Sequence, residues 1–325
     1  MALVISRSDA AQVIEMQDVI DAVAAAHGEH ALGNVKMPNR FAVHIPGGDD
    51  AVLPMVAAMP KLGAVGVKLL SIFPGNRAKG KPVLDATVLL VDPDDGSCLA
   101  VVDGGLLTAY RTASASAIAT RYLARNDSAV LGLVGLGVEG RSHFDALRLV
   151  RDITRVVGWT RSQATADRFR EHVGDAVPFE LMESPEAVVR ECDILCTLTP
   201  STTPIVHGEW LSEGMHINAV GTHENTAREI DTEAVVRSKI VVDILASVLD
   251  ECGDLNIPVA EGAITPDHFG TELGELVNGT ARPRRSDADI TLFKSVGVAV
   301  QDIATAHLIY TRARERGLGT EVSLG

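Results

Sequence analysis

The stretch Ser128–Val150, SAVLGLVGLGVEGRSHFDALRLV, joins an apolar run to an amphipathic one through three glycines. Gly135, Gly137 and Gly140 form the pattern GxGxxG, which becomes informative where a strand precedes it and a helix follows it. Residues 129–135 are typical of a buried strand, and apolar residues recur at helical spacing after the last glycine. The stretch therefore predicts a turn that holds the pyrophosphate of a dinucleotide at a helix N-terminus.

The three glycines have different expected roles. Gly135 permits a tight turn, and Gly137 lets the backbone approach a pyrophosphate with no Cβ in the way. Gly140 lets the helix pack closely against the strand. The alternative is a tight turn between strand and helix that binds no ligand.

Short β-branched runs alternate with helical patterns from about residue 129 to 245, as in a parallel sheet covered by helices. We expect strands at 129–135, 155–160, 179–182, 193–199, 215–221 and 239–244. The expected fold class is α/β, with a Rossmann-type doubly wound parallel sheet and a second α+β domain.

The flanking segments have other patterns. We expect a helix from about Ser8 to Leu32, then strands joined by Pro, Gly and Asp turns up to about residue 115. A helix rich in small residues, 107–127, should bridge the domains, and the tail from Thr291 should form a long amphipathic helix. The expected domains are 1–118 plus 303–325 and 119–302.

Composition restricts the partners. The net charge of −14 makes nucleic acid an unfavourable partner, since the averaged field repels polyanions. No apolar run approaches the ~20 residues that span a bilayer, so we expect a cytoplasmic protein without membrane contact. Four scattered cysteines favour neither a disulfide framework nor a metal site.

The end of the second expected strand of the nucleotide domain bears on the cofactor. An acidic residue there would accept hydrogen bonds from the adenosine ribose and repel a 2′-phosphate. The sequence instead has Thr160, Arg161 and Ser162, and a guanidinium beside hydroxyl groups suits a phosphate. NADP(H) is therefore favoured, with NAD(H) as the alternative if Arg161 is an ordinary solvated residue.

Several segments together resemble the ornithine cyclodeaminase/mu-crystallin family, which also contains archaeal-type alanine dehydrogenases and imino acid reductases. They are KMPNR, VGVKLLSIFPGN, VVDGGLLTAYRTASASAIATRYLA, LGLVGLGVEGRSH, INAVGTHENTAREID, IPVAEGAI and TLFKSVGVAVQD. The resemblance covers nearly the whole chain, and LTAYRTASASA followed by the glycine turn is its most specific part.

The resemblance implies that domain 119–302 binds NAD(P) and that domain 1–118 plus 303–325 binds substrate and pairs two subunits as a homodimer. It also implies roles for individual residues. Substrate contacts would fall on Arg40, Lys68 and Arg111. Cofactor contacts would fall on Arg111, Thr112, Val138, Glu139, Thr160, Arg161, Ser162, Thr199, Val220, Gly221 and Ser295.

The chemistry of the three cations agrees with this placement. Guanidinium groups bind carboxylates bidentately, and a lysine adds a point charge or a movable proton. Lys68 lies in the apolar run AVGVKLLSIF, where an unpaired lysine would cost several kcal/mol, so a functional role is favoured over a surface one.

Two departures from the cyclodeaminase pattern affect the expected reaction. The aspartate of the family's VGxD segment is replaced here by His223, and the segment AVLPMVAAMP lacks the glutamate that cyclodeaminases use. The sequence therefore favours an NAD(P)H-dependent reductase of a small α-imino acid, either a ketimine or imino acid reductase or an alanine dehydrogenase-like enzyme. A cyclodeaminase with bound NAD and a non-catalytic nicotinamide-binding protein are the alternatives. Either Lys68 or His223 would protonate the substrate nitrogen.

Overall fold

The computed structural model describes residues 1–324, the side chain of residue 77 apart, and the chain divides into two compact units. Unit 1 comprises Met1–Arg111 and the C-terminal segment from Val298 onward, and unit 2 comprises Thr112–Gly297. The boundaries predicted from the sequence lie near residues 118 and 302. Among the described residues no helix has the length and apolar character that crossing a membrane would need.

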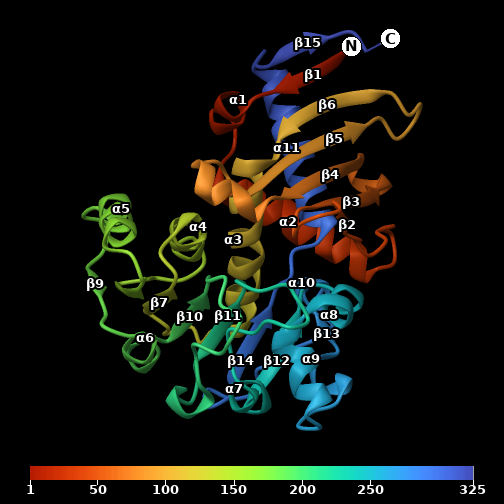
Figure 1. Ribbon diagram of the computed structural model, residues 1–325. Coiled ribbons are helices and arrows are strands. Elements are labelled where there is room, and N and C mark those ends of the chain that lie inside the picture. The colour runs from red at the N-terminus through yellow and green to blue at the C-terminus, as the bar shows by residue number, and fades with distance from the viewer. Residues whose placement is uncertain (325) are drawn as a thin grey trace. The chain divides into compact units, whose positions relative to one another are not determined.

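Unit 1 is built on a mixed sheet with the strand order β15-β1-β6-β5-β4-β3-β2. All of its neighbouring pairs are antiparallel except β1 with β6, and the pairing of β1 with β15 brings the two ends of the chain together (Figure 1). The strands are β1 (Ala2–Ile5), β2 (Val43–His44), β3 (Ala51–Met59), β4 (Ala64–Ile72), β5 (Leu84–Val91), β6 (Cys98–Asp103) and β15 (Thr320–Val322).

One face of this sheet is covered by the last helix of the chain. The helix α11 (Ala299–Glu315) packs on β3, β4 and β5 and also against α2 (Met16–Ala31). Strand residues alternate in exposure, so Met55 and Lys68 are buried whereas their neighbours Val56 and Leu69 are exposed. The sheet therefore has a buried face toward α11 and an opposite, partly exposed face.

The N-terminal helix was predicted as one element from Ser8 to Leu32, and this was wrong. The chain forms α1 (Arg7–Ala11) with a capping box at Ser6, leaves helical geometry through residues 12–15 and begins again with α2. Val13 and Ile14 lie in this break and are buried. Because the apolar spacing continues across the break, the periodicity did not reveal it.

The helix predicted from Thr291 was also wrong at its start. Residues Ile290–Lys294 form the strand β14, and α11 begins only at Ala299, after Gly297 with φ 76°. Every residue of β14 is buried, so neither a two-residue nor a helical repeat is visible in the sequence.

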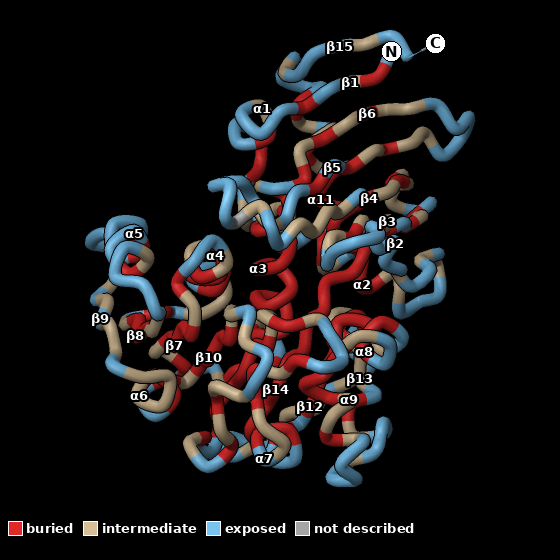
Figure 2. The backbone as a smooth tube through the Cα atoms, viewed as in Figure 1, coloured by how far each residue is buried: buried red, intermediate tan, exposed pale blue. Residues whose placement is uncertain are grey.

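Unit 2 has a parallel sheet with the strand order β13-β12-β14-β11-β10-β7-β8-β9. The six predicted strands are all present, and β13 (Thr271–Glu272) and β14 join them. The strands β10, β11 and β14 are buried throughout (Figure 2). The six are β7 (Val130–Val134), β8 (Arg155–Trp159), β9 (Phe179–Leu181), β10 (Ile194–Thr197), β11 (His216–Ala219) and β12 (Ser238–Val242).

This strand order creates a switch point beside β7. The chain passes from β7 to β8 and β9 on one side and later to β10 and β11 on the other. Ligands of open α/β sheets bind outside the carboxyl ends of the strands at such a point. The helices are α3 (Gly104–Leu123), which crosses the boundary between the units in sequence, α4 (Val138–Leu147), α5 (Gln163–Val173), α6 (Pro185–Glu191), α7 (Thr232–Val236), α8 (Leu245–Glu251), α9 (Gly253–Ala260) and α10 (Leu273–Val277).

Candidate active site

The glycine turn after β7 has the geometry that its sequence predicts. Gly135 has φ 111°, and a Cβ there would lie 2.6 Å from the carbonyl oxygen of Leu198. A Cβ at Gly140 would lie 2.6 Å from the carbonyl oxygen of Gly135, so α4 packs directly against the turn. Both positions exclude a side chain for reasons internal to the fold.

Gly137 differs from the other two. No heavy atom lies within 4 Å of the position that its Cβ would occupy, so packing does not explain the glycine. It is the N-cap residue of α4, and no side chain caps the first turn, where Val138 is 56% exposed and Glu139 follows. An open helix N-terminus of this kind fits the pyrophosphate of a dinucleotide.

The corner after β8 contains Thr160, Arg161 and Ser162. Ser162 is the N-cap residue of α5. Arg161 is exposed, and within residues 1–324 it forms no hydrogen bond or ion pair. Its guanidinium is therefore not committed to a protein partner.

The other predicted cofactor residues of unit 2 follow β10, β11 and β14. Thr199 comes two residues after β10, Val220 and Gly221 directly after β11, and Ser295 directly after β14. His223 lies in the same loop as Gly221 and is half-buried. Because these strands are parallel, all of these residues lie at the carboxyl edge of the sheet.

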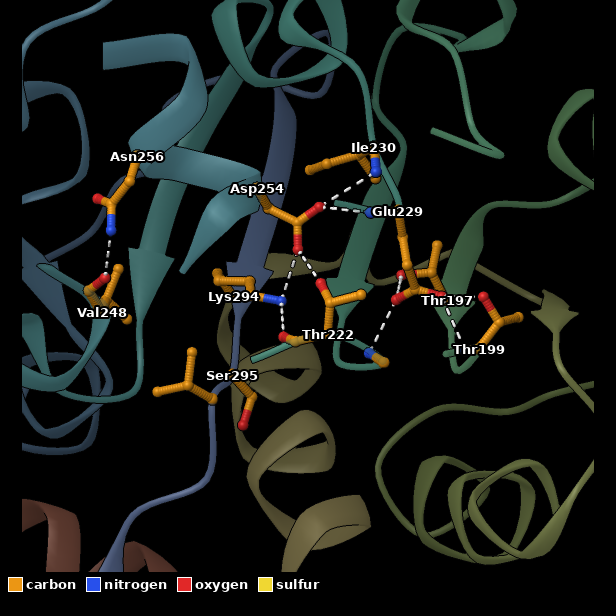
Figure 3. Close-up of polar contacts among 12 residues, drawn as sticks. Thr197, Thr199, Thr222, Glu229, Ile230, Val248, Asp254, Asn256, Lys294 and Ser295 are labelled. Atoms are coloured by element: carbon orange, nitrogen blue, oxygen red, sulfur yellow. Dashed lines mark hydrogen bonds and ion pairs between the residues drawn. The ribbon is translucent and has the colours of Figure 1, made fainter. Parts of the chain in front are cut away.

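A buried carboxylate that the sequence analysis missed joins two of these loops (Figure 3). Glu229 accepts hydrogen bonds from the hydroxyls of Thr197 and Thr199, each at 2.7 Å. It also accepts from the backbone amides of Thr199 at 2.7 Å and Gly221 at 2.8 Å. The groups that donate to Glu229 come together only after folding, so no sequence motif indicated this carboxylate.

A second missed group lies beside it. Asp254 accepts hydrogen bonds from the Lys294 ammonium and the Thr222 hydroxyl, each at 2.7 Å, and from the backbone amides of Glu229 and Ile230 (Figure 3). Lys294 also donates to the carbonyl of Thr222 at 2.7 Å. Its fully buried ammonium has a raised pKa because of Asp254, Cys252 and Glu229, although burial alone would lower it.

In unit 1, two of the predicted cations converge on one carboxylate. The Lys68 ammonium lies 2.7 Å from Oδ1 of Asp302, and Nε of Arg111 lies 2.9 Å from the same oxygen. Lys68 comes from β4, Arg111 from α3 and Asp302 from the first turn of α11. Lys68 and Asp302 are fully buried, and Arg111 is 6% exposed.

Arg40 belongs to the same cluster. Its Nη1 lies 3.9 Å from the sulfur of Met55, which is paired with Lys68 across β3 and β4, and its charge acts on Lys68. Burial and the charges of Arg111 and Arg40, opposed by the attraction of Asp302, together lower the pKa of Lys68 to about 8. The three predicted substrate residues are thus brought together.

Asp302 and Gln301 were not predicted as site residues. Gln301 accepts from Nη1 of Arg111 at 3.0 Å and is itself 3.1 Å from His27. The other Asp302 oxygen, Oδ2, is buried without a hydrogen-bond partner among the described residues. The sequence contains an acid at the end of SVGVAVQD, but nothing in the sequence indicated which cation it would pair with.

Comparison with known proteins identifies the family of the chain. Residues 2–317 match the sequence profile of the ornithine cyclodeaminase/mu-crystallin family. The chain belongs to this family. A Delta(1)-pyrroline-2-carboxylate reductase of Bacillus cereus is 35% identical over 323 residues, which cover 98% of this chain and 99% of the relative.

Two solved structures of family members are similar along their whole length. The Thermococcus litoralis Delta(1)-pyrroline-2-carboxylate reductase, in complex with NADH and L-proline, has 39% identity and a TM-score of 0.95 over 98% of this chain and 100% of that one. An archaeal alanine dehydrogenase dimer with bound NAD has 33% identity and a TM-score of 0.94 over 100% of this chain and 99% of that one.

The shifted pKa of Lys68 gives a prediction for activity. If protonated Lys68 supplies the proton during reduction, kcat/KM should fall as pH rises through about 8, since the charged form is then lost. Asp302→Asn removes the attraction that raises this pKa, so the fall should begin at lower pH. Initial rates between pH 6 and 10 test this expectation, and a decline centred near the ordinary histidine value of about 6.5 in both proteins would favour His223 instead.

Proposed function

We propose that the protein is an NAD(P)H-dependent reductase of a small α-imino acid, and that Δ1-pyrroline-2-carboxylate is the first substrate to test. The observation that carries this proposal is the buried cluster of unit 1. Among the described residues, the buried Lys68 and Arg111 are both paired with the one carboxylate of Asp302, and the charge of Arg40 also acts on Lys68. Excess buried positive charge favours binding of an anion. The reductases of Bacillus cereus and Thermococcus litoralis support the choice of substrate.

The geometry suggests a role for each cation. Arg111 uses Nε and Nη1 on Asp302 and Gln301, which leaves Nη2 without a hydrogen bond among the described residues. That nitrogen, together with Arg40, would hold the substrate carboxylate. Lys68 would donate its proton to the imine nitrogen, and Asp302 would hold the ammonium in place. Unit 1 thus acts as the substrate-binding domain in this proposal.

Unit 2 acts as the cofactor-binding domain. The open N-terminus of α4 at Gly137 would receive the pyrophosphate, and the residues after β10, β11 and β14 would contact the nicotinamide half. The nicotinamide supplies the hydride for the substrate carbon when bound. The chain itself supplies position, charge and the proton.

Deamination is less well supported by the same residues. The strand β3 contains no acid, and the residue paired with Lys68 on that strand is Met55. His223 stands at the position of the family aspartate. A carboxylate that could accept a proton from a substrate amine is therefore missing at both positions.

An assay panel tests the proposed activity. Purified protein should oxidise NADPH or NADH in the presence of cyclic or open-chain α-imino acids, measured by nicotinamide absorbance, and Lys68→Ala should lower kcat more than tenfold, or ~1.4 kcal/mol in the barrier. Ammonia release from ornithine without net cofactor oxidation would contradict the proposal in favour of a cyclodeaminase. Cofactor binding with neither reaction would favour a binding protein.

We also propose a preference for NADPH. Arg161 is exposed and uncommitted at the end of β8, where the adenosine ribose of a dinucleotide is read. In this proposal its guanidinium, with the hydroxyls of Thr160 and Ser162, binds the 2′-phosphate.

Arg161→Asp should reverse this preference. The variant removes the guanidinium and places an acid where it repels a phosphate, so kcat/KM for NADPH should fall at least tenfold relative to NADH. The ratio of the two kcat/KM values, measured with one imino acid, decides the matter. An unchanged ratio would remove Arg161 from cofactor selection.

We propose that the chain forms a homodimer through the exposed face of the unit 1 sheet. Pairing registers align an apolar row across five strands of this face, consisting of Val56, Val67, Leu89, Val101 and Val4. Val56 is 41% exposed and Val4 39%, and in the adjacent row Leu69 is 47% exposed. An apolar patch of this extent is typical of an interface, and the similar alanine dehydrogenase is described as a dimer.

Val56→Asp tests the dimer. Because Val56 faces away from the core, the variant should fold, but a carboxylate in an apolar interface should dissociate the subunits. Light scattering should then give 34.4 kDa rather than twice that mass. The control is Leu32→Asp at the end of α2, also exposed and outside the sheet, which should remain dimeric. A wild-type monomer would refute the proposal.

A further inference from the structure

The side-chain carboxylate of Glu229 connects two segments of unit 2. The residue is fully buried in the chain that follows β11. Its Oε1 accepts hydrogen bonds from the backbone amide and the hydroxyl of Thr199. Its Oε2 accepts hydrogen bonds from the Thr197 hydroxyl and the backbone amide of Gly221. The carboxylate therefore fixes the end of β10 to the end of β11.

The two segments meet so closely that a side chain does not fit between them. A Cβ at Gly221 would overlap the carbonyl oxygen of Thr199 and lie 2.6 Å from Oε2 of Glu229. Leu198, the residue before Thr199, contacts the glycine turn: its carbonyl oxygen lies 2.6 Å from the position that a Cβ of Gly135 would occupy. The segment held by Glu229 thus forms part of the switch-point edge beside β7.

We infer that Glu229 is a positioning residue for the nicotinamide cofactor: its ionised carboxylate sets the spacing between Thr199 and Gly221, and its protonation weakens cofactor binding. This inference rests on the proposed function, because it requires the carboxyl edge of unit 2 to bind NAD(P)H. Glu229 itself need not touch the cofactor.

The electrostatic surroundings of Glu229 place its ionisation in the working pH range. Burial and the nearby Asp254 raise the pKa of Glu229 to about 7, while hydrogen bonds from Thr197 and Thr199 and the charge of Lys294 oppose the rise. The ionised carboxylate accepts all four hydrogen bonds, whereas a protonated oxygen becomes a donor and accepts less well. Cofactor affinity should therefore fall as the pH is lowered from 8 to 6.

Binding of NADH to the full chain, without substrate, tests the inference. NADH is the suitable probe because it lacks the 2′-phosphate, which titrates near this range. Glu229→Gln keeps the shape but replaces one acceptor oxygen by a donor, so one backbone amide loses its acceptor and one threonine hydroxyl must reverse its hydrogen bond. At pH 8 its Kd should be about tenfold higher than that of the wild type, and the increase in Kd toward pH 6 should be absent.

Two further variants separate positioning from general stability. Thr197→Val removes one hydrogen bond and keeps the carboxylate, so Kd should rise about threefold with the pH dependence retained. Asp193→Asn alters a comparable set of hydrogen bonds at the amino edge of the same sheet. There Asp193 accepts hydrogen bonds from the backbone amides of Ala129 and Val130. It should lower the melting temperature without changing the Kd for NADH.

The outcomes distinguish the two proposals. Wild-type protein that does not bind NADH or NADPH would refute the proposed function. Wild-type protein that binds NADH, with a Glu229→Gln variant within twofold of it from pH 6 to 8, would refute the role of Glu229 alone. If Glu229→Gln does not fold, an unchanged Kd in Thr197→Val at pH 8 would refute that role.

Discussion

The ion pair between Lys68 and Asp302 is the constraint on which unit 1 depends. A lysine ammonium inside an apolar sheet costs several kcal/mol unless a partner is supplied, and here the partner comes from the last helix of the chain. The same oxygen of Asp302 also binds Arg111. One carboxylate therefore fixes the positions of β4, α3 and α11 and leaves the cluster with excess positive charge, which is the basis for an anionic substrate.

In unit 1 the buried acid pairs with cations, whereas the buried acids of unit 2 mainly bind backbone amides and hydroxyls. Glu229 and Asp254 accept backbone amides and hydroxyls from the segments that follow β10 and β11, and Asp243 accepts the amides of Val296 and Gly297 after β14. Loops at the carboxyl edge of a parallel sheet have few ladder hydrogen bonds of their own. Internal carboxylates replace those bonds and keep the edge in one conformation, which a cofactor site needs.

The sequence was sufficient for features with a local pattern. The glycine turn and the six strands of the nucleotide domain were predicted, because each depends on neighbouring residues. The positions of Asp302 and Glu229 could not be predicted, since their partners lie 234 and 32 residues away along the chain, at Lys68 and Thr197. The strand β14 was missed because a run that is buried on both faces has no periodicity.

The two buried lysines show why residue type and burial alone do not identify a reactive group. Lys68 in AVGVKLLSIF and Lys294 in TLFKSVGVAV both occur in apolar runs, and the side chains of both are fully buried. Burial lowers the pKa of Lys68, and the one acid beside it is opposed by two arginines, so the pKa is about 8 and the proton can be transferred near neutral pH. Lys294 has Asp254 and Glu229 nearby and no opposing cation among its main interactions, so its pKa rises and the proton is retained. The balance of neighbouring charge, which only the folded chain reveals, makes Lys68 suited to proton transfer and Lys294 to a structural role.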